Sequence, residues 1–337
     1  MANIVFSEGA GLQKSIYGDC QGPVKMIIEK KAEDFEAKSV LPEIYSMEKG
    51  THYAESYASM TAMEGFKPVG EGGAYPLDGM REGYLKTIRP MTWKDSFALT
   101  REIIDDTKMI DLKSQPQQFT SAYYRTRERF GAAVFGAALG GHKVLTFEGK
   151  NFDVAAADGE ALFSKAHPSI VNKKRTQCNM FSDEFSADAL AALESHMQGF
   201  EDEDGNTLDI APTTIVIAND YKLKKAVFEV IGADKDPHTA NNGFNFLFGR
   251  WRVVVWQKLN QFIKNGTAPW VLLDKDYNEE AHGAIFLDRE EFNVKSVIDE
   301  KNDNNIWTGR ARFGAGFNDW RAFCAGGIEG GEALIGG

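Results

Sequence analysis

The chain has 337 residues, 43% of them hydrophobic and 26% charged, which is typical of a folded globular protein and excludes a disordered one. It carries 38 Lys and Arg against 49 Asp and Glu, and the resulting net charge of −11 argues against tight binding of nucleic acid. No run approaches the ~18 apolar residues that span a bilayer, and residues 1–10 do not resemble a signal peptide, so we expect a protein made and kept in a cytosol.

The N-terminal part of the chain is poor in core-forming patterns. Residues 1 to about 50 show no long apolar period, so they are predicted to form an arm. Residues 50 to about 83 carry many helix and strand breakers: Gly65, Pro68, Gly70, Gly72, Gly73, Pro76, Gly79 and Gly83. Because this density excludes a long helix, we predict an extended loop or hairpin, which is usually functional or ordered by a partner.

The next segment holds the strongest helix signal. Strand patterns at 84–88 and 91–104 come first, and the second passes into a predicted short helix at 96–106. Apolar residues then recur at helical spacing over 117–139, and two glycines follow. This predicts a helix roughly 34 Å long at 1.5 Å per residue.

Two features of this predicted helix concern its surroundings. Small residues, among them Gly131 and Gly136, allow a neighbouring element to approach closely. The charged segment Arg125, Arg127, Glu128 and Arg129 is predicted to be a solvated face or an inter-subunit salt-bridge site rather than a DNA contact.

Helices and strands alternate irregularly in the second half of the chain. Ser186 is predicted to cap a helix at 187–197, and a buried strand at 213–218 leads into a helix at 221–231. Further strands are predicted at 250–258, 270–273, 283–287, 293–297, 305–313 and 320–325, with a flexible or surface-laid tail at 326–337. The predicted fold class is α+β, in a body with two sub-domains or long extensions.

No catalytic, cofactor-binding or metal-binding residues are predicted, so we expect no enzyme. Cys20, Cys178 and Cys324 lie far apart without a Cys-x-x-Cys pair, which indicates small apolar fillers rather than a disulfide framework or a zinc site. The six histidines form no metal-binding pair, and His167-Pro168 is predicted to be a turn. Glycines 70, 72 and 73 lack the Lys-Ser or Lys-Thr of a phosphate-binding loop.

The acidic run from Glu201 to Asn206 is the segment most similar to a cation site. Counted from Asp202, the sixth position of a calcium loop would be Thr207 instead of Gly, and the twelfth would be Thr213 instead of Glu. A solvated turn is therefore predicted. The alternative is a metal-dependent hydrolase that uses the 202–209 acidic loop through Asp202, Asp204 and Asp209.

Two lysines and a group of aromatic residues can each be interpreted as structural or as functional. Lys67 and Lys86 are predicted to be solvated, although a lysine in such a loop could instead form a covalent cross-link between subunits. An aromatic set at strand spacing is predicted to be core or interface rather than a base-stacking platform: Phe244, Phe246, Phe248, Trp251 and Trp256.

The order of these elements resembles that of the major capsid proteins of tailed bacteriophages, which have the Hong Kong 97-like fold. Leu162-Phe163-Ser164 followed by His167-Pro168 looks like a Leu-Phe-Ser-x-x-His-Pro segment of phage head subunits, and Phe313 to Arg321 is similar to the family's closing strand pair. Other similar segments are 212–220, 248–250 and 268–272.

The resemblance implies a division of the chain into an arm, a loop and two domains. Its parts are an N-terminal arm at 1–49, an extended loop at 50–90, a peripheral domain at 91–185 and 300–337 with its spine helix at about 117–139, and an axial domain at 186–299. Some relatives begin with a scaffolding segment. Here the arm starts almost at Met1, so a separate scaffolding protein, or none, is expected.

The function implied is that of a major capsid protein, which self-assembles into hexamers and pentamers forming the icosahedral head around packaged double-stranded DNA. The DNA would be held by non-specific containment, without cofactors or membrane contact. Expected partners are other copies of the chain, a scaffolding protein, a portal and cement proteins. The expected location is the virion, assembled in the host bacterial cytoplasm. The alternative on the same fold is an encapsulin-type nanocompartment shell with a cargo pocket.

Overall fold

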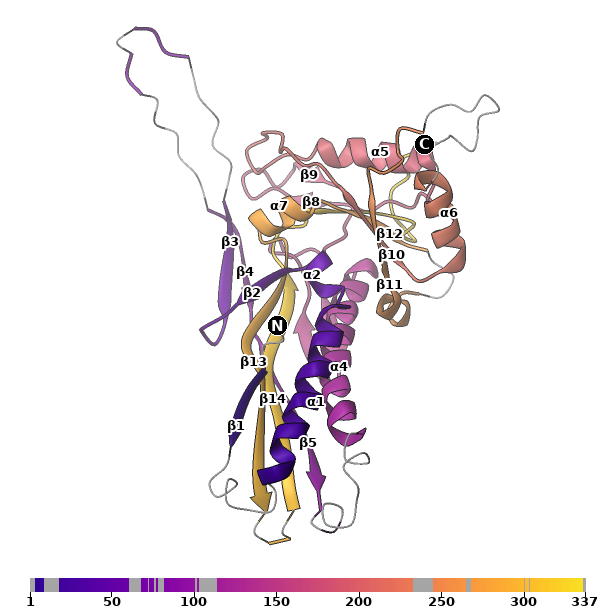
Figure 1. Cartoon of the computed structure of the whole chain (residues 1–337). Helices are drawn as coiled ribbons and strands as arrows, with labels where there is room; N and C mark the ends of the chain where they lie inside the picture. The colour runs from indigo at the N-terminus through magenta and orange to yellow at the C-terminus, as the bar shows by residue number, and fades with distance from the viewer. Residues whose placement is uncertain are drawn as a thin grey trace.

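The molecule is elongated, with long strands and two long helices at one end and a second, smaller sheet at the other (Figure 1). The computed structural model describes residues 4–8, 18–60, 68–71, 73–75, 77, 82–100, 102, 114–232, 245–264, 268–299, 301–302 and 304–335. No helix in these ranges is both long enough and apolar enough to cross a membrane.

A sheet built on one long antiparallel hairpin forms the larger end. Its strands are β1 (Ile4–Glu8), β2 (Ser46–Lys49), β5 (Met91–Leu99), β13 (Ala284–Asp299) and β14 (Asn304–Phe317). β13 pairs with β14, β5 extends the sheet beyond β14, and β1 and β2 pair with β13 in parallel. The two strands predicted at 283–287 and 293–297 are thus one strand, because register shifts between Asp288 and Asn293 interrupt its alternation.

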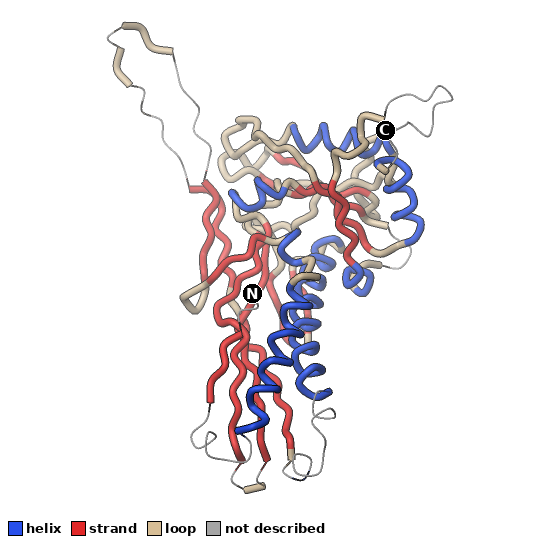
Figure 2. Tube along the Cα trace, in the orientation of Figure 1, coloured by secondary structure: helices blue, strands red, loops and turns tan. Residues whose placement is uncertain are grey.

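Two helices cover one face of this sheet (Figure 2). α4 (Ser114–Leu139) is the predicted spine helix, and it begins three residues earlier than predicted, with Pro116 in its first turn, where a missing N–H does no harm. Every residue from Phe130 to Leu139 is buried. α1 (Gly18–Glu36) packs along α4.

The prediction that residues 1–49 form an arm without an apolar period is wrong for α1, where Val24 and Ile28 are buried one turn apart, and for the segment around α2 (Leu41–Ile44). Leu41, Ile44 and Tyr45 are almost fully buried, and the Tyr45 hydroxyl donates to the Gly131 carbonyl at 2.8 Å. Strand β2 follows directly. A buried cluster this short produces no apolar period in the sequence, so it gave no core signal.

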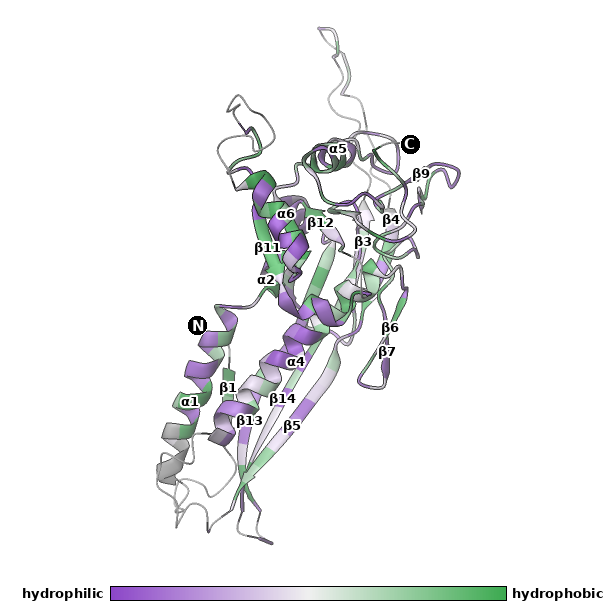
Figure 3. Ribbon diagram, turned by 90° about the vertical axis from the view of Figure 1, so that its right-hand side faces the viewer, coloured by the Kyte–Doolittle hydropathy of each residue, from purple (hydrophilic) through white to green (hydrophobic). Residues whose placement is uncertain are grey.

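The second sheet is mixed and flanked by short helices. Its order is β11 (Arg252–Trp256), β10 (Thr214–Ala218), β12 (Trp270–Leu273) and β15 (Phe323–Gly326), with β10 and β11 parallel. Around it lie α5 (Ala187–Gln198), α6 (Tyr221–Ile231), α7 (Lys275–Glu280) and the 3-10 helix η3 (Gln257–Gln261). β11 and β12 are strongly hydrophobic in Figure 3. The predicted helices at 187–197 and 221–231 are confirmed.

Side chains at the helix starts explain why α5, α6 and α7 begin where they do. Ser186, Asp220 and Asp274 each accept a hydrogen bond from a backbone N–H of the first turn. Each satisfies a donor that the helix itself leaves free.

Three two-stranded hairpins lie outside the two sheets. They are β3 (Glu55–Met60) with β4 (Glu82–Ile88), β6 (Val144–Phe147) with β7 (Lys150–Asp153), and β8 (His167–Pro168) with β9 (Thr176–Gln177). The hairpin β3–β4 extends beyond the loop predicted to end at about residue 83, because its second strand is the strand predicted at 84–88. His167-Pro168 is paired strand rather than the predicted turn.

The short helix predicted at 96–106 is wrong at its start, because Ser96 to Leu99 belong to β5. Pairing with β14 outweighs the local pattern there. Residues 101 and 103–106 of that prediction lie outside the described residues.

The register also corrects one predicted domain boundary. A division between 299 and 300 would separate β13, placed in the axial domain, from β14, placed in the peripheral domain, although they pair along almost their whole length. β15, placed in the peripheral domain, is an edge strand of the sheet that contains β10 and β12. One continuous cluster of buried side chains joins the two sheets. The rest of the division stays a prediction.

Candidate functional site

The acidic turn after α5 is only partly solvated, contrary to the prediction, because two of its acids are buried. Asp202 and Glu203 are each only 6% exposed. Asp202 Oδ1 accepts from the backbone N–H groups of Asp204, Gly205 and Asn206 at 3.0, 2.7 and 2.8 Å. Burial opposes ionisation of Asp202, but hydrogen bonds from the Asn206 side chain and from these amides outweigh it and hold its pKa below the ordinary value.

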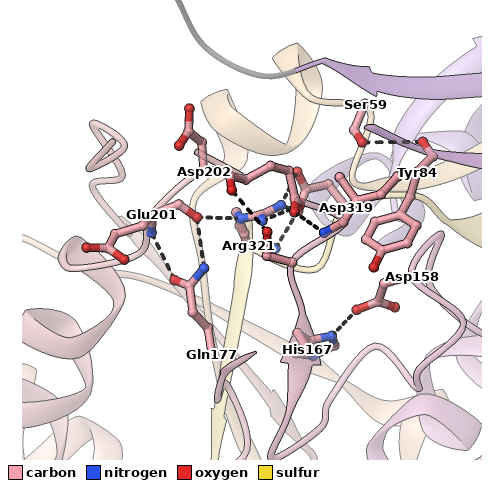
Figure 4. Close-up of polar contacts among 12 residues, drawn as sticks. Ser59, Tyr84, Asp158, His167, Gln177, Glu201, Asp202, Asp319 and Arg321 are labelled. Atoms are coloured by element: carbon pink, nitrogen blue, oxygen red, sulfur yellow. Dashed lines mark hydrogen bonds and ion pairs between the residues drawn. The ribbon is translucent and has the colours of Figure 1, made fainter. Parts of the chain in front are cut away.

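Arg321 forms an ion pair with Glu203, the acid next to Asp202. Figure 4 shows the Arg321 guanidinium beside Asp319. Its Nη2 donates to Glu203 Oε1 at 2.7 Å, its Nε donates to the Glu201 carbonyl at 2.9 Å, and its Nη1 lies 3.3 Å from both carboxylate oxygens of Asp319. The guanidinium also lies 4.9 Å from the centre of the Trp320 ring. The side chains of Glu203, Asp319, Trp320 and Arg321 are buried, so the cluster fastens the turn to the chain before β15.

His167 has a structural environment of the same kind. Its Nδ1 lies 2.6 Å from Asp158 Oδ2, its Nε2 lies 3.1 Å from Asn179 Oδ1, and its ring stacks on Trp320 at 4.1 Å. The side chain is fully buried. No reactant could reach this imidazole without opening the core, so it holds loops together.

The three carboxylates of the hydrolase alternative do not converge on a metal position. Asp204 and Asp209 are exposed, whereas Asp202 is buried and satisfied by its own turn. Across the described ranges, no group of three or more His, Cys, Asp or Glu side chains is arranged to hold a metal ion.

Cys178 and Cys324 are free thiols, and burial raises the pKa of both, to about 11 for Cys178.

The predicted aromatic set is divided by the structure. Trp251 and Trp256 are buried, as a core role requires. Phe246 and Phe248 lie in a turn before β11, not in a strand, and are 58% and 46% exposed. Phe244 lies outside the described residues.

The charged segment of α4 is also less solvated than predicted. Arg127 is mostly buried, pairs with Asp288 at 2.5 Å and covers the Phe286 ring. Glu128 accepts from the Trp256 indole at 2.9 Å and from the Ser39 hydroxyl at 2.8 Å. These contacts fasten the arm and the second sheet to the spine helix.

The β3–β4 hairpin is the part of the chain that projects farthest from the body (Figure 1). Its described tip residues are 68–71, 73–75 and 77, and we call them the hairpin tip. Val69, Tyr75 and Leu77 are 53%, 94% and 102% exposed there. Apolar side chains this exposed on a projecting loop are typical of a surface that another molecule covers.

Comparison with known proteins gives the family. The phage capsid protein family matches residues 84–326. The chain belongs to that family. No curated protein sequence matches it.

Solved structures agree with the assignment. The capsid of Ralstonia phage GP4 is 10% identical over 82% of each chain, with a TM-score of 0.51, so the fold is shared. A chain of Microbacterium phage Oxtober96 is 11% identical with a TM-score of 0.48, and the match covers 85% of this chain and 90% of that one. A chain of the capsid of the cyanophage P-SCSP1u is also 11% identical with a TM-score of 0.49, and the match covers 86% of this chain and 87% of that one. The predictions of an α+β, Hong Kong 97-like fold and of a major capsid protein forming the head shell are confirmed.

A structural role in the virion follows for this capsid protein, and with it association with copies of itself. The matched span begins within β4 and ends at the last residue of β15, so it omits α1, β3 and the hairpin tip. The family match thus describes neither the hairpin tip nor the N-terminal segments that pack on the body, α1 and β2 among them.

The capsid protein also has a groove that sequence patterns did not predict. It has a volume of about 700 Å³ and lies between the end of α1, the spine helix, β13 and the edge strand β11. Tyr124, Arg127, Val255, Trp256 and Asp288 line it. The groove forms from segments far apart in the sequence, so no local pattern marks it.

Proposed function

We propose that this capsid protein assembles into hexamers and pentamers that close an icosahedral head around packaged double-stranded DNA. The observation that supports closure by heterologous contacts is the projecting hairpin, which displays Tyr75 and Leu77 to solvent in the lone chain. Burying such side chains between subunits would contribute about 25 cal/mol per Å² of apolar surface.

The DNA would be contained rather than bound. A net charge of −11 gives the subunit little long-range attraction for phosphate, so packaged DNA would stay mobile against the shell. We further propose assembly in the host bacterial cytoplasm, a separate scaffolding protein, a portal and cement proteins as partners, and no catalytic residue.

Electron microscopy of the overexpressed protein tests the proposal. We expect closed particles of regular outline in negative stain and light scattering far above that of one 37.4 kDa chain. If the chain alone forms sheets or tubes, a second experiment co-expresses it with a scaffolding protein from the same phage. A chain that stays monomeric in both experiments would contradict the proposal.

An encapsulin-type shell is the second candidate, and the groove beside the spine helix is the observation that favours it. Its volume of about 700 Å³ falls within the range of ligand pockets, and a cargo-loading segment needs such a pocket. The contents of particles purified from the natural source distinguish the candidates. Packaged DNA supports the phage head, whereas an enclosed protein and no DNA supports the nanocompartment.

A further inference from the structure

The side of β4 that faces the body carries a buried lysine. Side chains alternate along the strand, and Tyr84, Lys86 and Ile88 lie on the body-facing side. Lys86 is only 5% exposed, although lysine is rarely buried unless its ammonium is paired. Its Nζ donates to Asp153 Oδ2 at 2.8 Å and to the Ala155 carbonyl at 2.7 Å. The predicted solvated Lys86 is therefore wrong, and Lys67 lies outside the described residues.

These contacts join the β3–β4 hairpin to the β6–β7 hairpin, although no strand of one pairs with a strand of the other. β3–β4 and β6–β7 are separate two-stranded sheets, and Asp153 is the last residue of β7. The Asp153 side chain is 68% exposed, whereas that of Lys86 is 6% exposed. The lysine thus crosses from one hairpin into the loop that follows the other.

The other described contacts between the hairpin and the body are mainly apolar or aromatic, and they include the Tyr57 ring against that of His282. Ile88 packs with Ile285 and Leu287 in a small cluster separate from the main core, and Tyr57 lies against that cluster. The Tyr84 hydroxyl donates to the Pro168 carbonyl at 3.1 Å. Apolar contact is non-directional and tolerates sliding, whereas hydrogen bonds from an ammonium have preferred distances and angles. The two Lys86 contacts are therefore the strongest directional restraint among the described contacts of the hairpin.

Direction matters because the hairpin tip lies far from the body (Figure 1). A small rotation at β4 therefore moves the hairpin tip by a much larger distance. We propose that Lys86 is a positioning residue that fixes the angle at which the β3–β4 hairpin leaves the body, and that shells of uniform size require it. This inference rests on the proposed assembly function.

Substitution of Lys86 by methionine tests it, because methionine keeps the length and the apolar stem but cannot donate. In the unassembled subunit we expect amide hydrogen exchange over residues 82–88 to become roughly tenfold or more faster. In assembly reactions we expect a broader distribution of particle diameters. The matched control is Lys49→Met, which removes a 74% exposed lysine that pairs with Glu291 at 2.9 Å. It should change neither measurement.

Unchanged exchange at 82–88 in Lys86→Met, or an unchanged distribution of diameters, overturns the proposal. If the wild-type chain forms no shells, the assembly function fails, and hydrogen exchange alone decides whether Lys86 positions the hairpin. If Lys86→Met does not fold, Asp153→Ala carries the test, because that exposed side chain is not part of the core. The Ala155 contact remains in Asp153→Ala, so exchange roughly threefold or more faster is expected, and no change overturns the proposal.

Discussion

Asp202 and Glu203 show how two adjacent carboxylates become buried without a metal ion. The first is satisfied by backbone amides of its own turn, and the second by Arg321, 118 positions away. Burial of a charge is tolerated only with such partners. The turn therefore acts as a fastening between α5 and the chain before β15, and its acids are structural in this chain.

Replacement of Asp202 by alanine should lower the free energy of unfolding by about 1–3 kcal/mol at neutral pH, because three backbone amides of the turn lose their acceptor. The folded-state pKa of Asp202 lies below its unfolded value, so its stabilisation is present above the unfolded pKa and is lost as pH falls through the folded one. The difference between wild type and variant should accordingly shrink at about pH 3.

Urea unfolding of the unassembled subunit at about pH 7, 5 and 3 measures this difference. Asp209→Ala, an exposed acid nearby, is the control and should stay within about 0.5 kcal/mol of wild type. A difference between Asp202→Ala and wild type that is equal at all three pH values would show that the carboxylate's charge does not contribute.

At the scale of elements, the spine helix depends on two glycines for its contacts. A Cβ at Gly131 would overlap the Leu41 side chain of the arm, and one at Gly136 would overlap the Phe262 side chain after η3. Glycine lowers helix propensity by about 1 kcal/mol, so close approach is the reason to have it here. The arm and the second sheet are both held against α4 at these positions.

A pair of glycine-to-alanine variants separates propensity from packing. Gly131→Ala should lower the free energy of unfolding by about 1–3 kcal/mol, because overlap with Leu41 exceeds the gain in helix propensity. Gly22→Ala in α1 meets no atom within 4 Å and should stabilise by about 0.5–1 kcal/mol. Thermal and urea unfolding of the subunit provide both numbers. A stabilising Gly131→Ala would mean that the arm does not pack on the spine helix as described.

Elements with a strong local signal were predictable from the sequence. The spine helix, α5 with its Ser186 cap, and the β10–α6 pair each combine an apolar period with a start signal, and their predicted bounds agree with the structure to within three residues. Local preference and tertiary contacts agree in these segments, so a single sequence is sufficient.

Other features depend on contacts between distant segments and could not be predicted. The sequence predicts two strands in place of β13, because the bulged stretch breaks the alternation of buried and exposed side chains. Pairing with β14 nevertheless holds β13 as one strand. Lys86 and Glu203 looked solvated because their partners Asp153 and Arg321 lie 67 and 118 positions away. The groove beside α4 was missed for the same reason, since its walls come from five separate parts of the chain.

At the scale of the whole molecule, stability and assembly reside in different parts of the chain. One continuous core joins both sheets and α4, and the acidic turn, the arm and β15 are fastened to it by buried polar contacts. The hairpin tip contributes nothing to this core. The lone subunit should therefore fold without the tip, while contacts between subunits require it.

Deletion of residues 61–81 tests this separation. Met60 and Glu82 are directly paired in the β3–β4 ladder, so joining them through Asn-Gly creates a two-residue hairpin turn and keeps the strands in register. The variant should match wild type in urea unfolding to within about 0.5 kcal/mol, because no described core residue is removed. It should form no stable shells in negative stain, since the exposed Tyr75 and Leu77 are gone.

The milder variant Tyr75→Ser with Leu77→Ser should also weaken assembly, but less than the deletion does. Shells of normal size and stability from the deletion variant would mean that the subunits hold together without this hairpin, and that the assembly contacts lie on the body itself.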